Sequence, residues 1–554
     1  MTPREGLATM VSADLSKKSY QIIRNTGVHH RADIYPTYDE VRAAKYECYP
    51  QNITITETVA EVKLSSLLNH TVSRLLEVPC VKEKISLLMP SVRKLGVFTC
   101  KWGFDGATGQ SEYKQKRASG EDAHDANLFS TTMVPLDLSF GGKSVWTNPH
   151  ASSTRFCRPK RLRYAKETTK LLVEEKNSVE DEIKELQPCL LSIIDDEGHP
   201  LDLEVEFALS LTMIDGKAAN AVTGTASAQK CSICGATPKQ MNTISCGKGT
   251  PISNQAALQF GVSPLHAWIR TFECVLHIGY RIHLQKWQVR GEEDKAKLAE
   301  RKKAIQIDFI QKLGLRVDFP AQNSSGSGTS NDGNTARRSF QNPSLFSSIT
   351  GVNEELITRL ANILSLVNSF QKINLEKYKG YCQQTFTLYC HLYKWFYMPA
   401  SLHKLLIHSS EVMTKFMLPI GMYSEEAQES RNKDNKNFRL HHARKDSRIH
   451  TFEDQFHYLL ITSDPLISTM IIEKEYCKSK NKNKELSAEA KALLEDEEIS
   501  NSSEIENETN PEEENSNASQ ENSEINDNLI ENDIMNEINS ERNRNTELPD
   551  YYFS

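Results

Sequence analysis

The stretch Leu201–Lys217, LDLEVEFALSLTMIDGK, decides how the centre of the chain folds. From Leu201 to Met213, apolar residues alternate with mostly polar ones. Because successive side chains of a strand point to opposite faces of a sheet, this period of two predicts a long β-strand. The predicted strand ends at Asp215, directly before Gly216, which places a carboxylate at its carboxyl end.

A second segment ends in the same way. Residues 94–109, KLGVFTCKWGFDGATG, predict a strand that reaches Asp105, again followed by glycine. Residues 127–149 contain two further β-rich runs around an FGG turn, which predict a hairpin. Residues 161–187 are charged and lack Gly and Pro, which predicts a helix. Together these segments predict a mixed α/β fold.

The chain of 554 residues is long enough for two or three domains. Residues 1–90 show apolar residues at helical spacing, which predicts a helical DNA-binding or dimerisation region, although an ordinary helical subdomain fits the pattern equally well. Residues 91–236 hold the predicted sheet, 237–420 are predicted to be mainly helical, and 421–477 to contain a further helix. From 478 to 554, Glu, Asn and Ser predominate, which predicts a disordered acidic tail.

Charge is distributed unevenly along the chain. Residues 495–554 contain 19 acidic residues and 2 arginines, whereas residues 1–494 contain 64 basic and 54 acidic residues, a net charge of +10. A basic body fits a polyanion such as DNA, although mild positive charge is also common in other proteins. The twelve scattered cysteines indicate reduced intracellular thiols, and no apolar run approaches the roughly 18 residues of a membrane span, so no membrane partner is expected.

The two Asp-Gly strand ends suggest a metal site. Carboxylates at the ends of adjacent strands can share Mg²⁺, and two such ions about 3.5 to 4 Å apart catalyse phosphoryl transfer. The alternative is that each Asp-Gly pair only turns the chain. A third carboxylate would favour the metal site, and YSEEAQESRNKDNKNFR, residues 423–439, offers Glu425, Glu426 and Glu429 on a predicted helix. Local pattern does not choose among these three, because negative charge suits any position in the first turns of a helix.

Two Cys/His pairs are the other metal-binding candidates. Cys231 and Cys234 form a C-x2-C pair, and His403 and His408 form an H-x4-H pair. Each pair fits zinc-ligand spacing, and together they would make a closed Cys2His2 site. Because the two pairs lie about 170 residues apart, their spacing alone does not show that they bind the same ion. The alternative is that the thiols are unpaired and the histidines are ordinary core or surface residues.

Nine sequence blocks occur in a fixed order between residues 5 and 475. They are LSKKSYQIIR, IYPTYDEVRAAKYECYP, KWGFDGATGQSEYKQK, NPHASSTRFCRPKRL, LSLTMIDGKAANAVTGTASAQKCSICGAT, LHAWIRTFECVLHIGY, GTSNDGNTARRSF, LHKLLIH and SEEAQESRNKDNKNFR. With these blocks the chain closely resembles the Transib family of DNA transposases, and it is more distantly similar to the catalytic subunit of the V(D)J recombinase.

The resemblance implies an RNase H-like core of the DDE type with a large helical, zinc-containing insertion. Asp105 and Asp215 match the family's two catalytic aspartates, and Glu429 matches its glutamate through the E-S-x-N-K pattern. These residues are then expected to bind two Mg²⁺ or Mn²⁺ ions, whereas Glu425 and Glu426 become helix-start residues. The family's four structural zinc ligands match Cys231, Cys234, His403 and His408.

The implied activity is cleavage of double-stranded DNA at terminal inverted repeats. Water nicks one strand, the released 3′-hydroxyl forms a hairpin on the flanking DNA, and the element's 3′-hydroxyl later joins target DNA. The family works as a homodimer, and a nuclear location is expected. The alternatives are a domesticated recombinase-like endonuclease, a catalytically inactive zinc-stabilised DNA-binding protein and, less favoured, a Cys/His metalloenzyme.

Clustered cations are candidate phosphate contacts, which would position a duplex without reading its sequence. They are Arg155, Arg158, Lys160, Arg161, Arg337, Arg338, Lys433 and Arg444. The alternative for each cluster is a solvated basic loop. One of Trp395, Phe396 and Tyr397 is a candidate to stack on an extruded base, although aromatic triplets are usually core.

Overall fold

The computed structural model describes residues 1–89, 92, 94–110, 125–194, 198, 200–243, 251–260, 262–320, 329–476 and 486–495. One compact unit covers Met1–Leu494, and a second covers Glu495–Ser554, of which all but Glu495 lies outside the described residues. Most of the predicted acidic tail therefore falls outside them too. No helix in the described part of the chain is long and apolar enough to cross a membrane.

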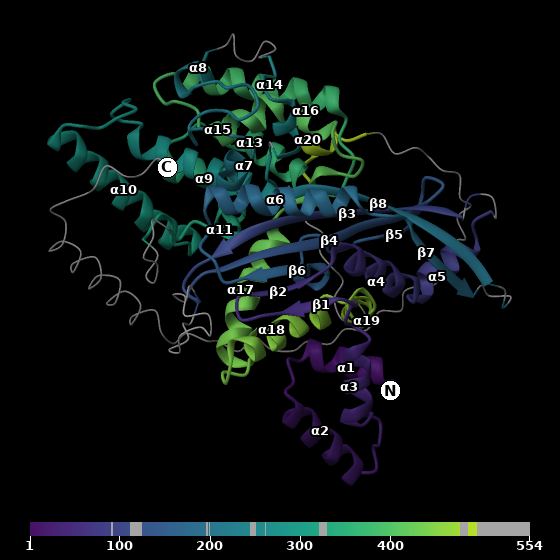
Figure 1. The fold of residues 1–554 in the computed structure, drawn as a ribbon. Helices are drawn as coiled ribbons and strands as arrows, with labels where there is room; N and C mark the ends of the chain where they lie inside the picture. The colour runs from purple at the N-terminus through teal and green to yellow at the C-terminus, as the bar shows by residue number, and fades with distance from the viewer. Residues whose placement is uncertain are drawn as a thin grey trace, which may run out of the picture. The chain divides into compact units, whose positions relative to one another are not determined.

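The described strands form one eight-stranded sheet (Figure 1). Its order is β1-β2-β6-β4-β3-β8-β7, with β5 paired to β4. Among these strands, β3 and β8 run parallel and the other neighbours run antiparallel. The strands are β1 (Ile53–Ile55), β2 (Val59–Val62), β3 (Leu95–Ala107), β4 (Leu128–Phe140), β5 (Lys143–Thr147), β6 (Arg158–Arg163), β7 (Cys189–Ile194) and β8 (Pro200–Met213).

The structure confirms the two predicted Asp-Gly strands as β3 and β8, and the predicted hairpin as β4 and β5. Gly141 and Gly142 turn this hairpin with positive φ angles of 54° and 77°, a conformation that other residues adopt at a cost. The parallel pairing brings β3 and β8 very close at a bulge, because a Cβ on Gly103 would lie 1.9 Å from the carbonyl oxygen of Met213.

The prediction that residues 1–90 are helical is wrong for 53–62. Despite the helical spacing of its apolar residues, Val59–Val62 forms β2, which pairs with β6 and brings β1 into the sheet. The predicted helix over 161–187 is likewise shorter, because β6 continues to Arg163. Helices around the sheet are α4 (Leu64–Leu76), α5 (Pro79–Ser86), α6 (Thr169–Lys184), α7 (Gly216–Val222), α17 (Glu426–His441), α18 (Arg448–Thr462) and α19 (Pro465–Tyr476).

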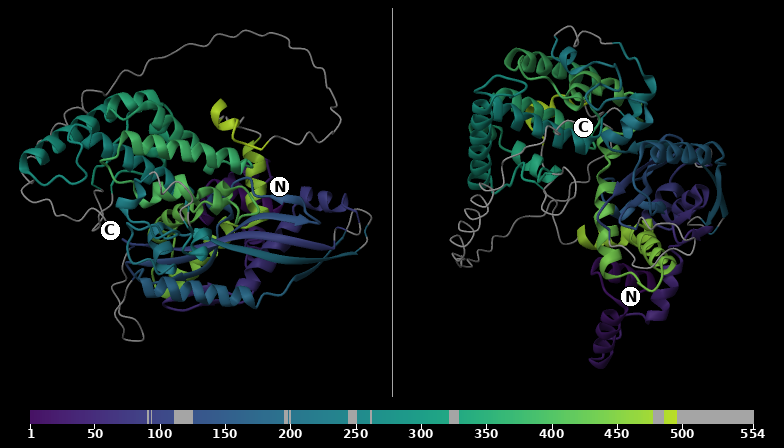
Figure 2. Two further views of the ribbon diagram at one scale, coloured as in Figure 1. Left: turned by 90° about the horizontal axis from the view of Figure 1, so that it is seen from above. Right: turned by 60° about the vertical axis from the view of Figure 1, so that its left-hand side comes forward.

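A separate helical region occupies the sequence between α7 and α17, and Figures 1 and 2 show its helices gathered together. Its own core includes the buried side chains of Phe272, Phe346, Tyr378 and Phe386. It contains α8 (Pro238–Met241), α9 (Pro264–Arg281), α10 (Glu292–Leu313), α11 (Gly333–Phe340), α12 (Pro343–Thr350), α13 (Glu354–Val367), α14 (Leu375–Leu392), α15 (Ala400–His403), the π-helical segment η4 (Lys404–His408) and α16 (Ser409–Met413).

Residues 486–494 also pack on this helical region. The short helix α20 (Ala488–Lys491) buries Ala490 and, just beyond it, Leu493 in the same core. The Asn362 amide donates to the Glu489 carboxylate at 2.7 Å. The prediction of disorder is therefore wrong for this segment. The segment contains apolar residues that can pack, but the average composition of 478–554, which is rich in Glu, Asn and Ser, does not reveal them.

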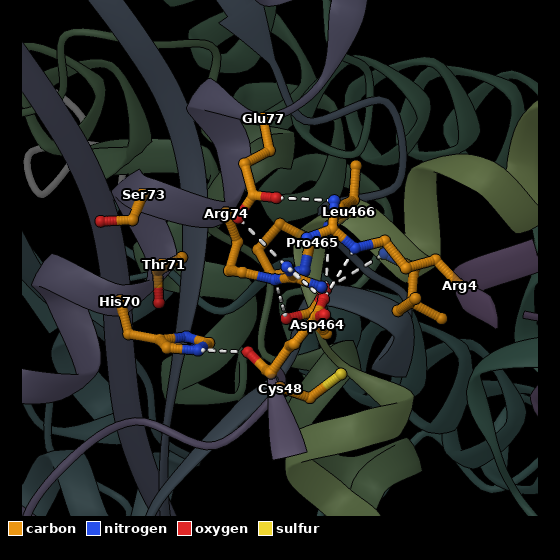
Figure 3. A network of polar contacts seen from close by, with 12 residues as sticks. Arg4, Cys48, His70, Thr71, Ser73, Arg74, Glu77, Asp464, Pro465 and Leu466 are labelled. Atoms are coloured by element: carbon orange, nitrogen blue, oxygen red, sulfur yellow. Dashed lines mark hydrogen bonds and ion pairs between the residues drawn. The ribbon is translucent and has the colours of Figure 1, made fainter. Parts of the chain in front are cut away.

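The N-terminal helices α1 (Pro3–Ser12), α2 (Lys17–His29) and α3 (Tyr38–Tyr46) form a third core with α19. Figure 3 shows the polar network beside it. The buried Arg74 of α4 donates to both oxygens of Asp464, at 2.9 and 3.2 Å. Asp464 also accepts from the backbone N–H groups of Leu466 and Ile467 at 3.1 Å, so it holds α4 to the start of α19.

Candidate functional site

Two aspartates meet at one end of the sheet. Gly103 of β3 lies opposite Met213 of β8, so Asp105 and Asp215, each two residues further on, lie at the same end of two adjacent parallel strands. Asp105 is still inside β3, which continues to Ala107 beyond the predicted end, whereas Asp215 follows β8. Asp215 also caps α7, because its Oδ1 accepts from the N–H of Ala218 at 2.7 Å. The fold thus fixes both carboxylates with backbone elements.

Helix α17 brings the third carboxylate to this edge. The Gln428 amide donates to Ser130 Oγ of β4 at 2.6 Å, and the Asn432 amide donates to Asp105 Oδ2 at 2.6 Å. Residues three apart share one face of a helix, so Glu429 lies on the same side of α17 as Asn432. Asn432 is the asparagine of the E-S-x-N-K pattern, which by itself predicts no contact with Asp105.

The start of α17 is anchored by a lysine on the strand that carries Asp105. Lys101 is fully buried, and its Nζ donates to the carbonyl oxygens of Met422 and Ser424 at 2.8 and 2.6 Å. Burial lowers the pKa of Lys101 to about 7. These bonds fix the backbone directly before α17 and thereby the position of the helix turn that holds Glu429.

Asp105 is buried near three other carboxylates. Burial, followed by the negative charges of Asp215, Glu167 and Glu429, raises the pKa of Asp105 to about 7. Glu167 is a fourth carboxylate that no motif indicated. It lies against Gly106, where an added Cβ would come 2.7 Å from the Cβ of Glu167.

The side chains around Asp105 carry oxygen donors of the kind that divalent cations bind. Asp105, Asp215, Glu167 and Glu429 offer hard carboxylate oxygens, which Mg²⁺ and Mn²⁺ prefer. Lys217 pairs with Glu167 at 2.9 Å but is mostly exposed, so it only partly neutralises the negative charge that, after burial, raises the pKa of Asp105. A bound cation would offset that charge.

The raised pKa of Asp105 predicts a pH-dependent stability for the metal-free protein. The folded state holds this proton more tightly than the unfolded chain, whose aspartates titrate near 3.9, so the free energy of unfolding should fall as pH rises from about 4 to about 7. Asp105→Asn should remove this loss and make the variant more stable than the wild type at pH 8 by a few kcal/mol.

Thermal unfolding in EDTA at pH 5 and pH 8 measures this difference. Asp202→Asn, at an exposed position of β8, is the control and should keep the wild-type pH dependence. The same pH dependence in Asp105→Asn and in the wild type would contradict the prediction.

The four Cys and His candidates come together in the helical region. Ligand atoms of Cys231, Cys234, His403 and His408 all lie within 4.8 Å of one another. In an α-helix, histidines five residues apart point in different directions. The π-helical turn of η4, with its i→i+5 hydrogen bonding, lies between His403 and His408 and aligns them.

The chemistry of this Cys2His2 cluster fits zinc. Hydrogen bonding from Cys234 holds the pKa of the Cys231 thiol well below its usual range despite burial, and both histidines add to the effect. Cys234 Sγ lies 3.4 Å from His403 Nε2, and His408 Nε2 is buried without a hydrogen-bond partner. A thiolate pair with two buried imidazoles is a four-ligand set suited to structural Zn²⁺.

Three predicted DNA contacts are wrong, because they are buried in β6. Arg158 is fully buried, and its Nη2 lies 3.3 Å from His70 Nδ1. Lys160 pairs with Glu182 at 2.6 Å, while Arg161 pairs with glutamates of β2 and α6. Lys160 and Arg161 neutralise carboxylates of the fold, and the burial of all three cations makes them unavailable to a phosphate.

The other predicted contacts differ in accessibility. Lys433 and Arg338 are exposed, whereas Arg155 is partly buried. Arg444 is half exposed and pairs with Glu453 and Asp454. Arg337 forms an ion pair with Glu426.

The aromatic triplet is mostly part of the helical core. Phe396 is buried, with its ring centroid 4.8 Å from that of Trp287. The predicted stacking on an extruded base is therefore wrong for Phe396. Trp395 and Tyr397 are partly buried.

No family model matches the chain, and no curated protein matches it. Among solved structures, a Drosophila P element transposase strand transfer complex matches with 11% sequence identity and a TM-score of 0.27, covering 85% of this chain and 92% of that one. A TM-score this low does not show a shared fold.

Proposed function

We propose that this chain is a DDE-type DNA transposase with an RNase H-like catalytic core. The main support is the convergence of Asp105, Asp215 and Glu429 from β3, β8 and α17, since these are the positions that match the catalytic motif of the Transib family. Three carboxylates far apart in sequence and close enough to perturb a pKa are unusual unless they bind a cation.

Each residue near the site has a proposed role. Divalent ions held by Asp105, Asp215 and Glu429 would supply activation of the attacking oxygen and stabilisation of the leaving one. Glu167 adds a fourth oxygen donor beside Asp105. Asn432 orients Asp105 by donating to its Oδ2, which leaves Oδ1 to the N–H of Gly106 and to a ligand.

The proposed substrate is double-stranded DNA that carries terminal inverted repeats. Cleavage proceeds by hydrolytic nicking and hairpin-forming transesterification, and strand transfer to target DNA follows. The Cys2His2 cluster holds structural Zn²⁺ in the helical region that separates Asp215 from Glu429 in sequence. A homodimer in the nucleus would bring two DNA ends together.

Incubation of the full chain with DNA bearing inverted repeats from its own genomic flanks tests this proposal. Nicks and hairpin ends should form with Mg²⁺ or Mn²⁺ and not with EDTA. Cleavage without strand transfer would favour a domesticated endonuclease. Salt-dependent DNA binding with no metal-dependent product would instead favour an inactive DNA-binding protein and contradict the proposal.

A further inference from the structure

Glu425 joins the start of α17 to α9. It is 4% exposed and stands at the N-cap position of α17, but its side chain makes no capping bond. Its Oε1 instead accepts from Ser263 Oγ and lies 2.8 Å from His266 Nδ1. Burial opposes a charge on His266, but the hydrogen bond and charge of Glu425 outweigh it and raise the pKa of His266 to about 9. The contact is therefore a partly buried ion pair at neutral pH.

Glu426 joins the same turn to α11. Its carboxylate pairs with the guanidinium of Arg337, which also lies 5.9 Å above the ring of Trp268 on α9. Both partners are about one-fifth exposed, so the pair is better shielded than a surface ion pair. Two successive glutamates thus contact two different helices of the helical region.

Lys101 completes the attachment from the opposite side. It binds the backbone carbonyl of Ser424 from β3, directly before the two glutamates. The first turn of α17 is consequently held between the sheet and the helical region, and Glu429 follows within one turn.

We propose that Glu425 and Glu426 are positioning residues that clamp the first turn of α17 to α9 and α11 and so set the location of Glu429. This rests on the proposed function. The clamp replaces the sequence interpretation of both glutamates as helix-start residues, since neither carboxylate is used to cap α17. It also makes the placement of the third carboxylate depend on the helical region, which contains the Cys2His2 cluster.

Paired substitutions test the clamp. Glu425→Gln, Glu426→Gln and Arg337→Gln should each slow DNA cleavage about tenfold at saturating DNA, because small displacements of catalytic groups are costly. They should also raise the Mg²⁺ concentration for half-maximal rate. The charge-exchanged double variant Glu426→Arg/Arg337→Glu should recover most of the lost rate. Glu293→Gln removes an exposed ion pair of α10 and is the matched control.

Hydrogen exchange separates the clamp from the proposed function. In the DNA-free and metal-free protein, peptides over 423–432 should exchange about tenfold faster in the three single variants than in the wild type or in Glu293→Gln. Faster exchange in a protein that cleaves no DNA would support the clamp and reject the transposase. Wild-type exchange and wild-type cleavage in the single variants would overturn the clamp, as would a charge-exchanged variant that recovers neither.

Discussion

Asp105→Asn and Glu429→Gln are each expected to slow DNA cleavage by about 10³-fold or more, since each removes a charged oxygen donor from a unit that acts only when complete. The shapes of the side chains are nearly unchanged, so the sheet and α17 should keep their packing. Loss of rate should therefore come without loss of folding. Single-turnover cleavage in Mg²⁺ measures the rate, and fluorescence anisotropy in Ca²⁺ at one fixed salt concentration measures DNA affinity.

DNA affinity distinguishes a catalytic defect from a folding defect. Both variants should bind DNA within about twofold of the wild type, because phosphate contacts carry most of the affinity and these residues are acidic. Asp202→Asn on β8 should cleave and bind like the wild type. Wild-type cleavage by Asp105→Asn would remove this residue from the catalytic set, and lost DNA binding would indicate a folding defect.

Local sequence was sufficient for the strands that carry Asp105 and Asp215, because the alternation of Leu201–Met213 needs no tertiary partner to be recognised. It was not sufficient for their adjacency. The parallel pairing of β3 and β8 joins residues more than a hundred positions apart and is stabilised by sheet contacts that no local window contains. The same reason explains why β1 and β2 were mistaken for helix.

Side-chain partners were the least predictable feature. Arg158, Lys160 and Arg161 look like a solvated basic cluster in sequence, but α4, α6 and β2 contribute the groups that surround them. No sequence motif indicates that Glu167 lies beside Asp105, since a single glutamate before a helix is common in any protein. The H-x4-H spacing matched zinc ligands, yet the π-helical turn that aligns these histidines was not visible in sequence.

Removal of the proposed zinc is expected to cause the largest loss of stability. Cys231, His403 and His408 are buried, and the cluster connects the segment after α7 to the helices just before α17. Cys231→Ser should lower zinc content from one ion per chain to near zero. Loss of a structural metal worth about 10 kcal/mol should lower the melting temperature by about 10 °C.

Metal analysis by mass spectrometry and thermal unfolding check the two effects. Cys80→Ser, at an exposed cysteine, should retain the wild-type zinc content and melting temperature. The helical region that contains the cluster also contains α9 and α11, which contact the start of α17, so cleavage should fall together with zinc content in His408→Ala as well. A zinc-free wild type with the same melting temperature as the metal-loaded protein would show that the cluster is not a structural metal site.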